Sequence, residues 1–326
     1  MVQRNKKITV SAPGKLMLLG EHAVVYNRPC LVTAVDQRMR ATVELLDSQD
    51  FELEAPDVKV TGYKKPLSQL GVGDIPKGAQ FVEIAIKNIS EKYPFKSGLR
   101  VTTVSEFSSQ FGFGSSSAST VCAIKAVSQL LGLNLSEREI FDFSYKTVLD
   151  IQGKGSGFDV AAAVFGGTLY FVTGGKVIEP LKISSLPLIV GYSGIKADTV
   201  TLINKVKESF AGKEDSLEKI YDDISLLVEQ AKDTITASDW KKFGELMNKN
   251  QEYLSELGVS IDKLDDMING AVSAGAYGAK LSGAGGGDCM IAVAPKKKEQ
   301  LVRQSIKQAG GEPIDIITNA QGVRLE

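Results

Sequence analysis

The sequence predicts an α+β chain with two lobes, because strand-like and helix-like patterns fall in different parts of it. Short segments rich in Val, Thr and Leu, often alternating, dominate the first hundred residues, at 7–11, 30–35, 39–46 and 99–105; this period of two is typical of strands. Long helical patterns dominate residues 199–274, and the chain closes on a β-α-β order. Such segregation of strands from helices favours α+β architecture.

Apolar periodicity and capping residues place the individual elements. Ser136 followed by Glu139 is a capping box, and Gly132 is a typical helix C-cap. The 3.6-residue pattern predicts helices at 80–93, 117–131, 136–146, 199–210, 216–237, 239–257, 261–274 and 297–309. Further strands are expected at 168–172, from 188, and at 279–281, 290–294 and 313–318. We place the lobe boundary so that the domains are 1–180 and 181–326.

Composition excludes several classes of partner. The 326 residues are 43% hydrophobic and 24% charged, with a net charge of −1. This balance gives no reason to expect nucleic acid or an anionic membrane as partner, and no apolar run approaches ~18 residues. Three dispersed cysteines fit a reducing compartment. We expect a cytoplasmic enzyme, monomeric or homodimeric, that holds any anionic ligand by local groups.

The strongest local motif is GFGSSS, residues 112–117, at the start of a predicted helix. Gly112 and Gly114 allow close backbone approach, and a helix N-terminus offers unpaired N–H groups to phosphate. Ser115, Ser116 and Ser117 add hydroxyl groups. The alternative is a serine cap after a flexible turn. The motif is neither a Walker A loop nor a GxGxxG fingerprint.

A second glycine-rich motif, LSGAGGGDC at 281–289, lies between two predicted strands. Four glycines in five residues, among them Gly285 and Gly286, cost backbone entropy. Close approach to a ligand or to another loop is expected to compensate, and a plain tight turn is the alternative.

Two charged residues are candidates for catalysis. Asp159 stands at the mouth of a small apolar segment, where it would orient or deprotonate an alcohol or cap a helix. Lys15 follows a strand and a Pro13-Gly14 turn, so it is aimed at a cleft. Glu21 and His22, the sole histidine, have either a binding or a purely structural role.

Jointly, APGK (12–15), GFGSSSAS (112–119) and LSGAGGGDC (281–289) resemble the three signature motifs of the GHMP small-molecule kinases, in order and spacing over essentially the whole chain. The resemblance implies a β-rich N-terminal domain like ribosomal S5 domain 2, a ferredoxin-like C-terminal domain, and ATP and Mg²⁺ bound at the central loop. The resemblance therefore implies an ATP-dependent kinase whose acceptor is a small-molecule alcohol or phosphate.

The resemblance also implies roles for individual residues. The central loop binds the ATP phosphates, Ser116 ligates the metal, and Glu106 is a second metal candidate because Val148 falls where the family carries a glutamate. Asp159 acts on the acceptor hydroxyl, with Lys15 close enough to keep it ionised. Gly285 and Gly286 close over the nucleotide. The acceptor pocket is expected to contain Glu21, His22, Tyr26, Ser193 and Lys196.

Within the family, residues 12–36 are most similar to mevalonate kinases, whereas QGKGSGFD (152–159) and Asp288 look more like phosphomevalonate kinases. We expect phosphorylation of the primary alcohol of mevalonate. Phosphomevalonate is the alternative acceptor, for which Lys154, Lys196 and Arg28 would supply cations. A non-catalytic metabolite sensor on the same fold is the third hypothesis, disfavoured because Lys15 and Asp159 are both present.

Overall fold

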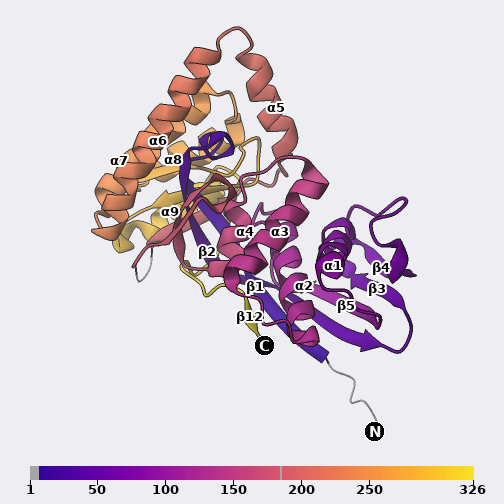
Figure 1. Cartoon of the computed structure of the whole chain (residues 1–326). Coiled ribbons are helices and arrows are strands. Elements are labelled where there is room, and N and C mark those ends of the chain that lie inside the picture. Colours follow the sequence, from indigo (N-terminus) through magenta and orange to yellow (C-terminus); the bar gives the residue numbers. More distant parts are fainter. Residues whose placement is uncertain (1–6, 184–185) are drawn as a thin grey trace.

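The computed structural model describes residues 7–183 and 186–326, and it places them in two lobes, each built on one sheet (Figure 1). The predicted α+β class is confirmed. The first sheet has the order β12-β1-β2-β5-β3-β4, with β6 and β7 added beside β2. Its strands are β1 (Lys7–Leu19), β2 (Pro29–Leu46), β3 (Asp50–Ala55), β4 (Val60–Pro66), β5 (Gly98–Ser105), β6 (Thr168–Val172), β7 (Val177–Pro180) and β12 (Arg324–Leu325).

Two long strands form the spine of this lobe, and here the sequence-based prediction was wrong. The segments 30–35 and 39–46 are one continuous strand, β2, which pairs with β6 at its start and with β5 at its end. The predicted turn at Pro13-Gly14 is absent; β1 continues through it with only a shift of register between these residues. Lys15 therefore projects from a strand.

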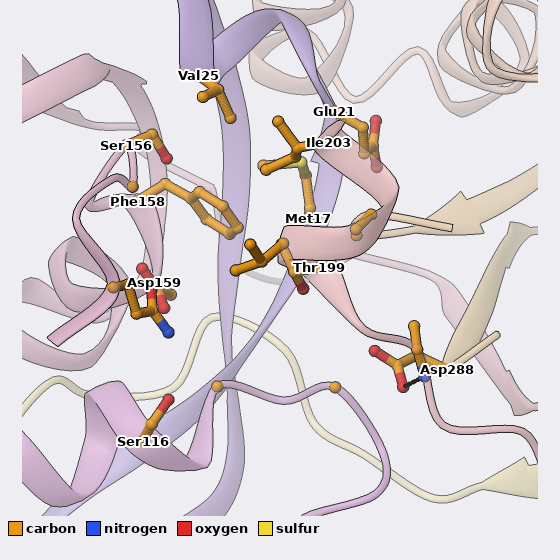
Figure 2. Close-up of a pocket in the computed structure, with 18 of the residues that line it drawn as sticks. Met17, Glu21, Val25, Ser116, Ser156, Phe158, Asp159, Thr199, Ile203 and Asp288 are labelled. Atoms are coloured by element: carbon orange, nitrogen blue, oxygen red, sulfur yellow. Dashed lines mark hydrogen bonds between the residues drawn. The ribbon is translucent and has the colours of Figure 1, made fainter. Parts of the chain in front are cut away.

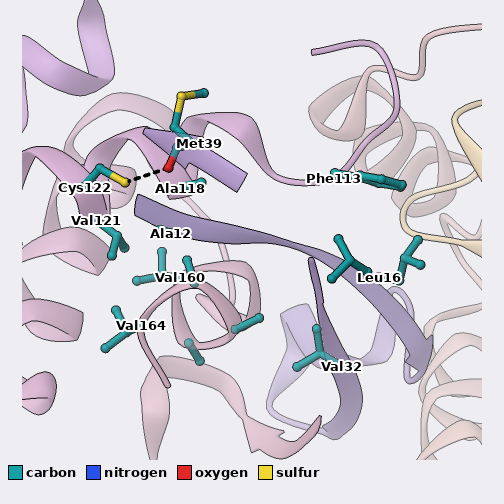
Figure 3. Packing of buried hydrophobic residues seen from close by; sticks show 14 of the residues in the cluster. Ala12, Leu16, Val32, Met39, Phe113, Ala118, Val121, Cys122, Val160 and Val164 are labelled. Carbon is teal, nitrogen blue, oxygen red and sulfur yellow. Dashed lines mark hydrogen bonds between the residues drawn. The ribbon is translucent and has the colours of Figure 1, made fainter. Parts of the chain in front are cut away.

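Helices α1 (Gln80–Lys92), α2 (Ser115–Leu131), α3 (Glu137–Gln152) and α4 (Phe158–Phe165) complete the first lobe. Buried side chains of α2 and α4 pack against β1 and β2, as Figure 3 shows for Val121 and Val160. The capping box at Ser136 and the left-handed C-cap at Gly132 are confirmed. Helix α2 begins two residues before its predicted start, so Ser115 and Ser116 lie in its first turn.

The second lobe contains an antiparallel sheet of order β11-β8-β10-β9. Its strands are β8 (Leu188–Tyr192), β9 (Gly278–Ser282), β10 (Cys289–Val293) and β11 (Glu312–Ile314), and its helices are α5 (Thr199–Ser209), α6 (Glu214–Thr236), α7 (Trp240–Glu256), α8 (Asp262–Ser273) and α9 (Glu299–Gln308). The chain order is β8, then α5 to α8, then β9, β10, α9 and β11. With the antiparallel sheet order given above, this is the predicted ferredoxin-like arrangement.

The lobes share one hydrophobic core that runs from the first sheet into β8 and β10. The last residues of the chain return to the first lobe, where β12 pairs with β1 (Figure 1). Buried Arg38 fixes this return by donating to the carbonyl oxygens of Ser11, Gln321 and Gly322. No helix within 7–183 or 186–326 has the length and apolar character needed to cross a membrane.

Candidate active site

The central glycine-serine loop lies directly on β1 at the junction of the lobes. The backbone N–H of Lys15 donates to the carbonyl oxygen of Phe113 at 3.0 Å. Gly114 is the N-cap of α2, with a φ of 80° that glycine adopts without strain. Gly112, Gly114, Ser115 and Ser116 line a cavity, which receives the positive end of the helix dipole. This arrangement suits a phosphate group.

Asp159 reaches the same cavity from the first turn of α4 (Figure 2). Gly157, not Asp159, is the N-cap of that helix, so the capping alternative is wrong. One carboxylate oxygen of Asp159 accepts a 2.5 Å hydrogen bond from the hydroxyl of buried Ser117. Ser117 does not line the cavity. It instead orients the carboxylate, while Ser115 and Ser116 face the open space.

Lys15 lines the cavity beside Asp159, but its ammonium group donates to the carbonyl oxygen of Gly112 at 2.7 Å. It also lies 5.3 Å from the ring centroid of Phe158. The ion pairs among the described residues do not include the expected one between Lys15 and Asp159. A Cβ built on Gly114 would lie 3.4 Å from Lys15 Cε and 3.6 Å from Asp159 Cβ. Both side chains thus lie next to the same point of the phosphate loop, at Gly114.

Glu21 and His22 form the other end of the cavity, just after β1. His22 has a φ of 59° and a ψ of −52°, and the N–H of Ala23 donates to Glu21 O at 2.7 Å, which makes a strained γ-turn. His22 Nε2 donates to the carbonyl oxygen of Ala284 at 2.9 Å. Burial lowers the pKa of His22, partly opposed by that hydrogen bond and by Glu21. The ring is therefore neutral near pH 7, and its buried Nδ1 is a hydrogen-bond acceptor without a partner.

Behind Glu21 stands a functional candidate that the sequence-based reasoning missed. Lys280, on β9, is 0% exposed, and its ammonium group forms an ion pair with Glu21 Oε1. Burial lowers the pKa of Lys280, whereas the carboxylate of Glu21 raises it. A lysine inside the otherwise apolar strand GAKLS was the available signal, because a buried cation requires a partner.

The glycines of the C-terminal motif do not line the cavity as predicted; only Gly283 does. A Cβ on Gly285 would lie 2.3 Å from Val259 O, and one on Gly286 would lie 2.9 Å from Leu202 Cδ1. Their freedom serves close packing inside the second lobe. The alternative of approach to another loop therefore holds for Gly285, whereas Gly286 approaches helix α5.

Three further candidates lie outside the cavity. Tyr26 stacks on Tyr221 of α6, with ring centroids 4.8 Å apart. Ser193 is buried and its hydroxyl closes a turn with Ile195. Glu106 accepts from the backbone of Arg38 and pairs with Arg40, so both its oxygens are occupied. These contacts give no support to the roles expected for them in acceptor or metal binding.

Lys196 does line the cavity, and its ammonium group donates to Ser109 O at 2.8 Å. Asp288 also lines the cavity (Figure 2), and its carboxylate accepts a hydrogen bond from the N–H of Ala197 at 3.0 Å. Its Oδ2 would lie 2.4 Å from a Cβ on Gly112, so the carboxylate rests against the phosphate loop. Burial raises the pKa of Asp288.

The oxygen donors of this cavity suit Mg²⁺, which takes few protein ligands and keeps water and substrate phosphates around it. Ser116 and Asp159 supply a hydroxyl and a carboxylate, whereas Val148 lines the wall with an apolar side chain. Over 7–183 and 186–326 no cluster of three or more His, Cys, Asp or Glu side chains is placed to hold a metal. A metal here would be held mainly by the phosphates.

Comparisons with known proteins agree with this geometry. The model of the GHMP kinase N-terminal domain matches residues 80–167, and that of the GHMP kinase C-terminal domain matches residues 227–312. A mevalonate kinase of Pyrococcus abyssi is 38% identical over 98% of each chain. The crystal structure of Methanococcus jannaschii mevalonate kinase has a TM-score of 0.81 at 26% identity, covering 97% of this chain and 99% of that one. Streptococcus pneumoniae phosphomevalonate kinase, at 16% identity and a TM-score of 0.79 over 96% and 99%, shares the fold.

Proposed function

The chain belongs to the GHMP kinase family, and on that premise we propose that it transfers the γ-phosphoryl group of ATP to the primary hydroxyl of mevalonate. Its mevalonate kinase relatives, matched over nearly their full length, support this acceptor. So does the hydrogen-bonding character of the acceptor end of the cavity. A sensor role would leave Lys15 and Asp159, which both lie at the phosphate loop, without a purpose.

The observation that carries the choice of mevalonate is the pair of unsatisfied acceptors at Glu21 and His22. Over residues 7–183 and 186–326, buried Glu21 Oε2 and His22 Nδ1 have no hydrogen-bond partner, and both residues line the cavity. They suit hydroxyl donors, whereas a phosphate of about two negative charges would be repelled by a carboxylate beside it.

The cations expected to hold a second phosphate are mostly engaged elsewhere. Arg28 is bound to Glu218 and Asp222 on α6 and lies outside the cavity. Lys154 lines the cavity but donates to Asn204 at 2.6 Å. Phosphomevalonate is therefore the weaker candidate.

In the proposed mechanism, the N-terminus of α2 and Gly112 to Ser116 hold the nucleotide phosphates. Asp159, oriented by Ser117, accepts the proton of the acceptor hydroxyl as the hydroxyl oxygen attacks the γ-phosphorus; the bond from that phosphorus to the β–γ bridging oxygen breaks, and ADP leaves. Lys15 places positive charge beside the transferring group. Ser116 would hold Mg²⁺, which would supply neutralisation of the phosphate charge. Glu21 and His22 fix the acceptor.

A coupled ADP-release assay on purified protein, with ATP, Mg²⁺ and either acceptor, tests this proposal. We expect mevalonate to give a kcat/KM at least about tenfold above that of phosphomevalonate, a transition-state difference of about 1.4 kcal/mol. The reverse preference would reassign the acceptor. An absence of phosphoryl transfer to either would contradict the proposed enzyme activity.

A further inference from the structure

Lys280 and Ser282 of β9, and Ala284 just after that strand, hold the turn that carries Glu21 and His22. The hydroxyl of Ser282 donates to Met17 O at 2.9 Å, and the carbonyl oxygen of Ala284 accepts from His22 at 2.9 Å. Lys280 forms its ion pair with Glu21. Lys280 and Ser282 are alternate residues of β9 and point to one side, and the backbone of Ala284 follows directly, so this second-lobe segment supports the acceptor end of a cavity built largely by the first lobe.

Among these contacts, the one made by Lys280 involves the charge of the site. Both partners of the ion pair are 0% exposed in their side chains. Lys280 also donates to the carbonyl oxygen of Leu281, so its ammonium group has partners on both lobes. Removing one member of such a buried pair leaves the other charge without compensation, which favours the neutral form of that group.

Only one oxygen of Glu21 is used by Lys280. The second, Oε2, is buried and unpaired, while Glu21 itself lines the cavity (Figure 2). A buried polar atom without a partner is rare in native structures and needs an explanation, which a ligand in the adjoining cavity would supply. The adjacent γ-turn at His22 is strained, and such strain persists only where surrounding contacts impose it.

We propose that Lys280 is a positioning residue of the acceptor subsite: through the buried ion pair it holds Glu21 turned so that Oε2 accepts a hydrogen bond from an acceptor hydroxyl. This inference rests on the proposed function, since it assigns the acceptor to the Glu21 end of the cavity. Lys280 itself is behind Glu21 and outside the cavity lining. It acts on the acceptor through Glu21 and has no direct part at the phosphate loop.

The test compares Lys280→Met, Glu21→Gln and the double variant, with Lys296→Met as the control for loss of a lysine on the same lobe; Lys296 is exposed and pairs with Glu299. KM for mevalonate, KM for ATP, kcat and the melting temperature are measured for each. We expect Lys280→Met to raise KM for mevalonate by about tenfold or more while changing KM for ATP by less than about twofold. Lys296→Met should match the wild type.

The double variant separates positioning from packing. If Lys280 acts through Glu21, the double variant has the same KM for mevalonate as Glu21→Gln alone, because the carboxylate through which Lys280 acts is already absent. If the two effects multiply, or if Lys280→Met melts earlier with an unaltered KM, Lys280 is only structural and the proposal is wrong.

Two further results are informative. Should Lys280→Met fail to fold, the double variant, which contains no unpaired buried charge, still decides the question by comparison with Glu21→Gln. If the wild type phosphorylates another acceptor, the proposed function is wrong. The KM values of the same variants are then compared for that acceptor. Equal KM values for Glu21→Gln and the double variant there would uphold the role of Lys280 independently.

Discussion

At the scale of single residues, the cavity contains two kinds of polar group: those that are hydrogen-bonded within the protein, and those that lack a partner among the described residues. Lys15 is held by Gly112 and Asp159 by Ser117, so each is fixed before any ligand arrives. Glu21 Oε2 and His22 Nδ1 remain without partners. The fixed groups therefore belong to the phosphoryl-transfer end, and the unpaired acceptors belong to the end that recognises the alcohol.

Lys15→Met tests the first of these assignments. Because the ammonium charge acts on the transition state more than on bound ATP, we expect kcat to fall by about 10²–10³-fold with a small change in KM for ATP. Steady-state kinetics with nucleotide titration measures both. A loss confined to KM for ATP would move Lys15 to ground-state binding.

At the scale of elements, two glycine-rich segments have different purposes. The central loop uses its glycines to place α2 against β1 and open the cavity. The C-terminal motif uses Gly285 and Gly286 to approach Val259 and Leu202. The sequence shows both as glycine clusters, and the difference arises from what lies opposite each of them in the fold.

Gly285→Ala distinguishes these purposes, with Gly132→Ala as its matched control. Both glycines have positive φ, 84° and 70°, but a Cβ meets Val259 O only at Gly285. We expect Gly132→Ala to cost about 1 kcal/mol of unfolding free energy and Gly285→Ala about 3 kcal/mol or more. Urea denaturation measures both. Equal stabilities together with lost nucleotide binding in Gly285→Ala would restore the predicted ligand role.

Local sequence patterns predicted most helices and the two-lobed class, because amphipathic periodicity and helix caps depend on residues that are close together in the sequence. They failed where long-range pairing decides. Pro13-Gly14 looks like a turn, yet pairing with β2 keeps it in a strand. Asp159 and Lys15 were predicted as site residues from their motifs, but the ion pair expected between them is replaced by contacts to Ser117 and Gly112 that no spacing reveals.

At the scale of the whole molecule, the two lobes are held by a shared core, by β9 against β1, and by the returning C-terminal segment. Arg38 is central to the last of these, because its guanidinium group satisfies backbone carbonyls of segments far apart in the chain. The cavity at the junction keeps its shape only while both lobes stay in place.

We therefore expect Arg38→Met to destabilise the protein by about 2–4 kcal/mol, since buried carbonyl oxygens lose their donors. Arg40→Met is the control: Arg40 is 38% exposed and forms surface ion pairs with Glu106 and Glu326, whose loss should cost about 1 kcal/mol or less. Chemical denaturation compares the two. Equal losses would show that Arg38 contributes no more than a surface ion pair.

The central claim is that Asp159, held by Ser117 in a cavity between the lobes, takes the proton of the acceptor alcohol. Asp159→Asn retains the shape and removes the base, so kcat should fall by about 10²–10⁴-fold while calorimetry still detects ATP binding. Ser117→Ala leaves the carboxylate in place without its hydrogen-bond donor, so kcat should fall less than in Asp159→Asn. A kcat for Asp159→Asn within about twofold of the wild type would contradict the account, because general-base contributions are far larger than that.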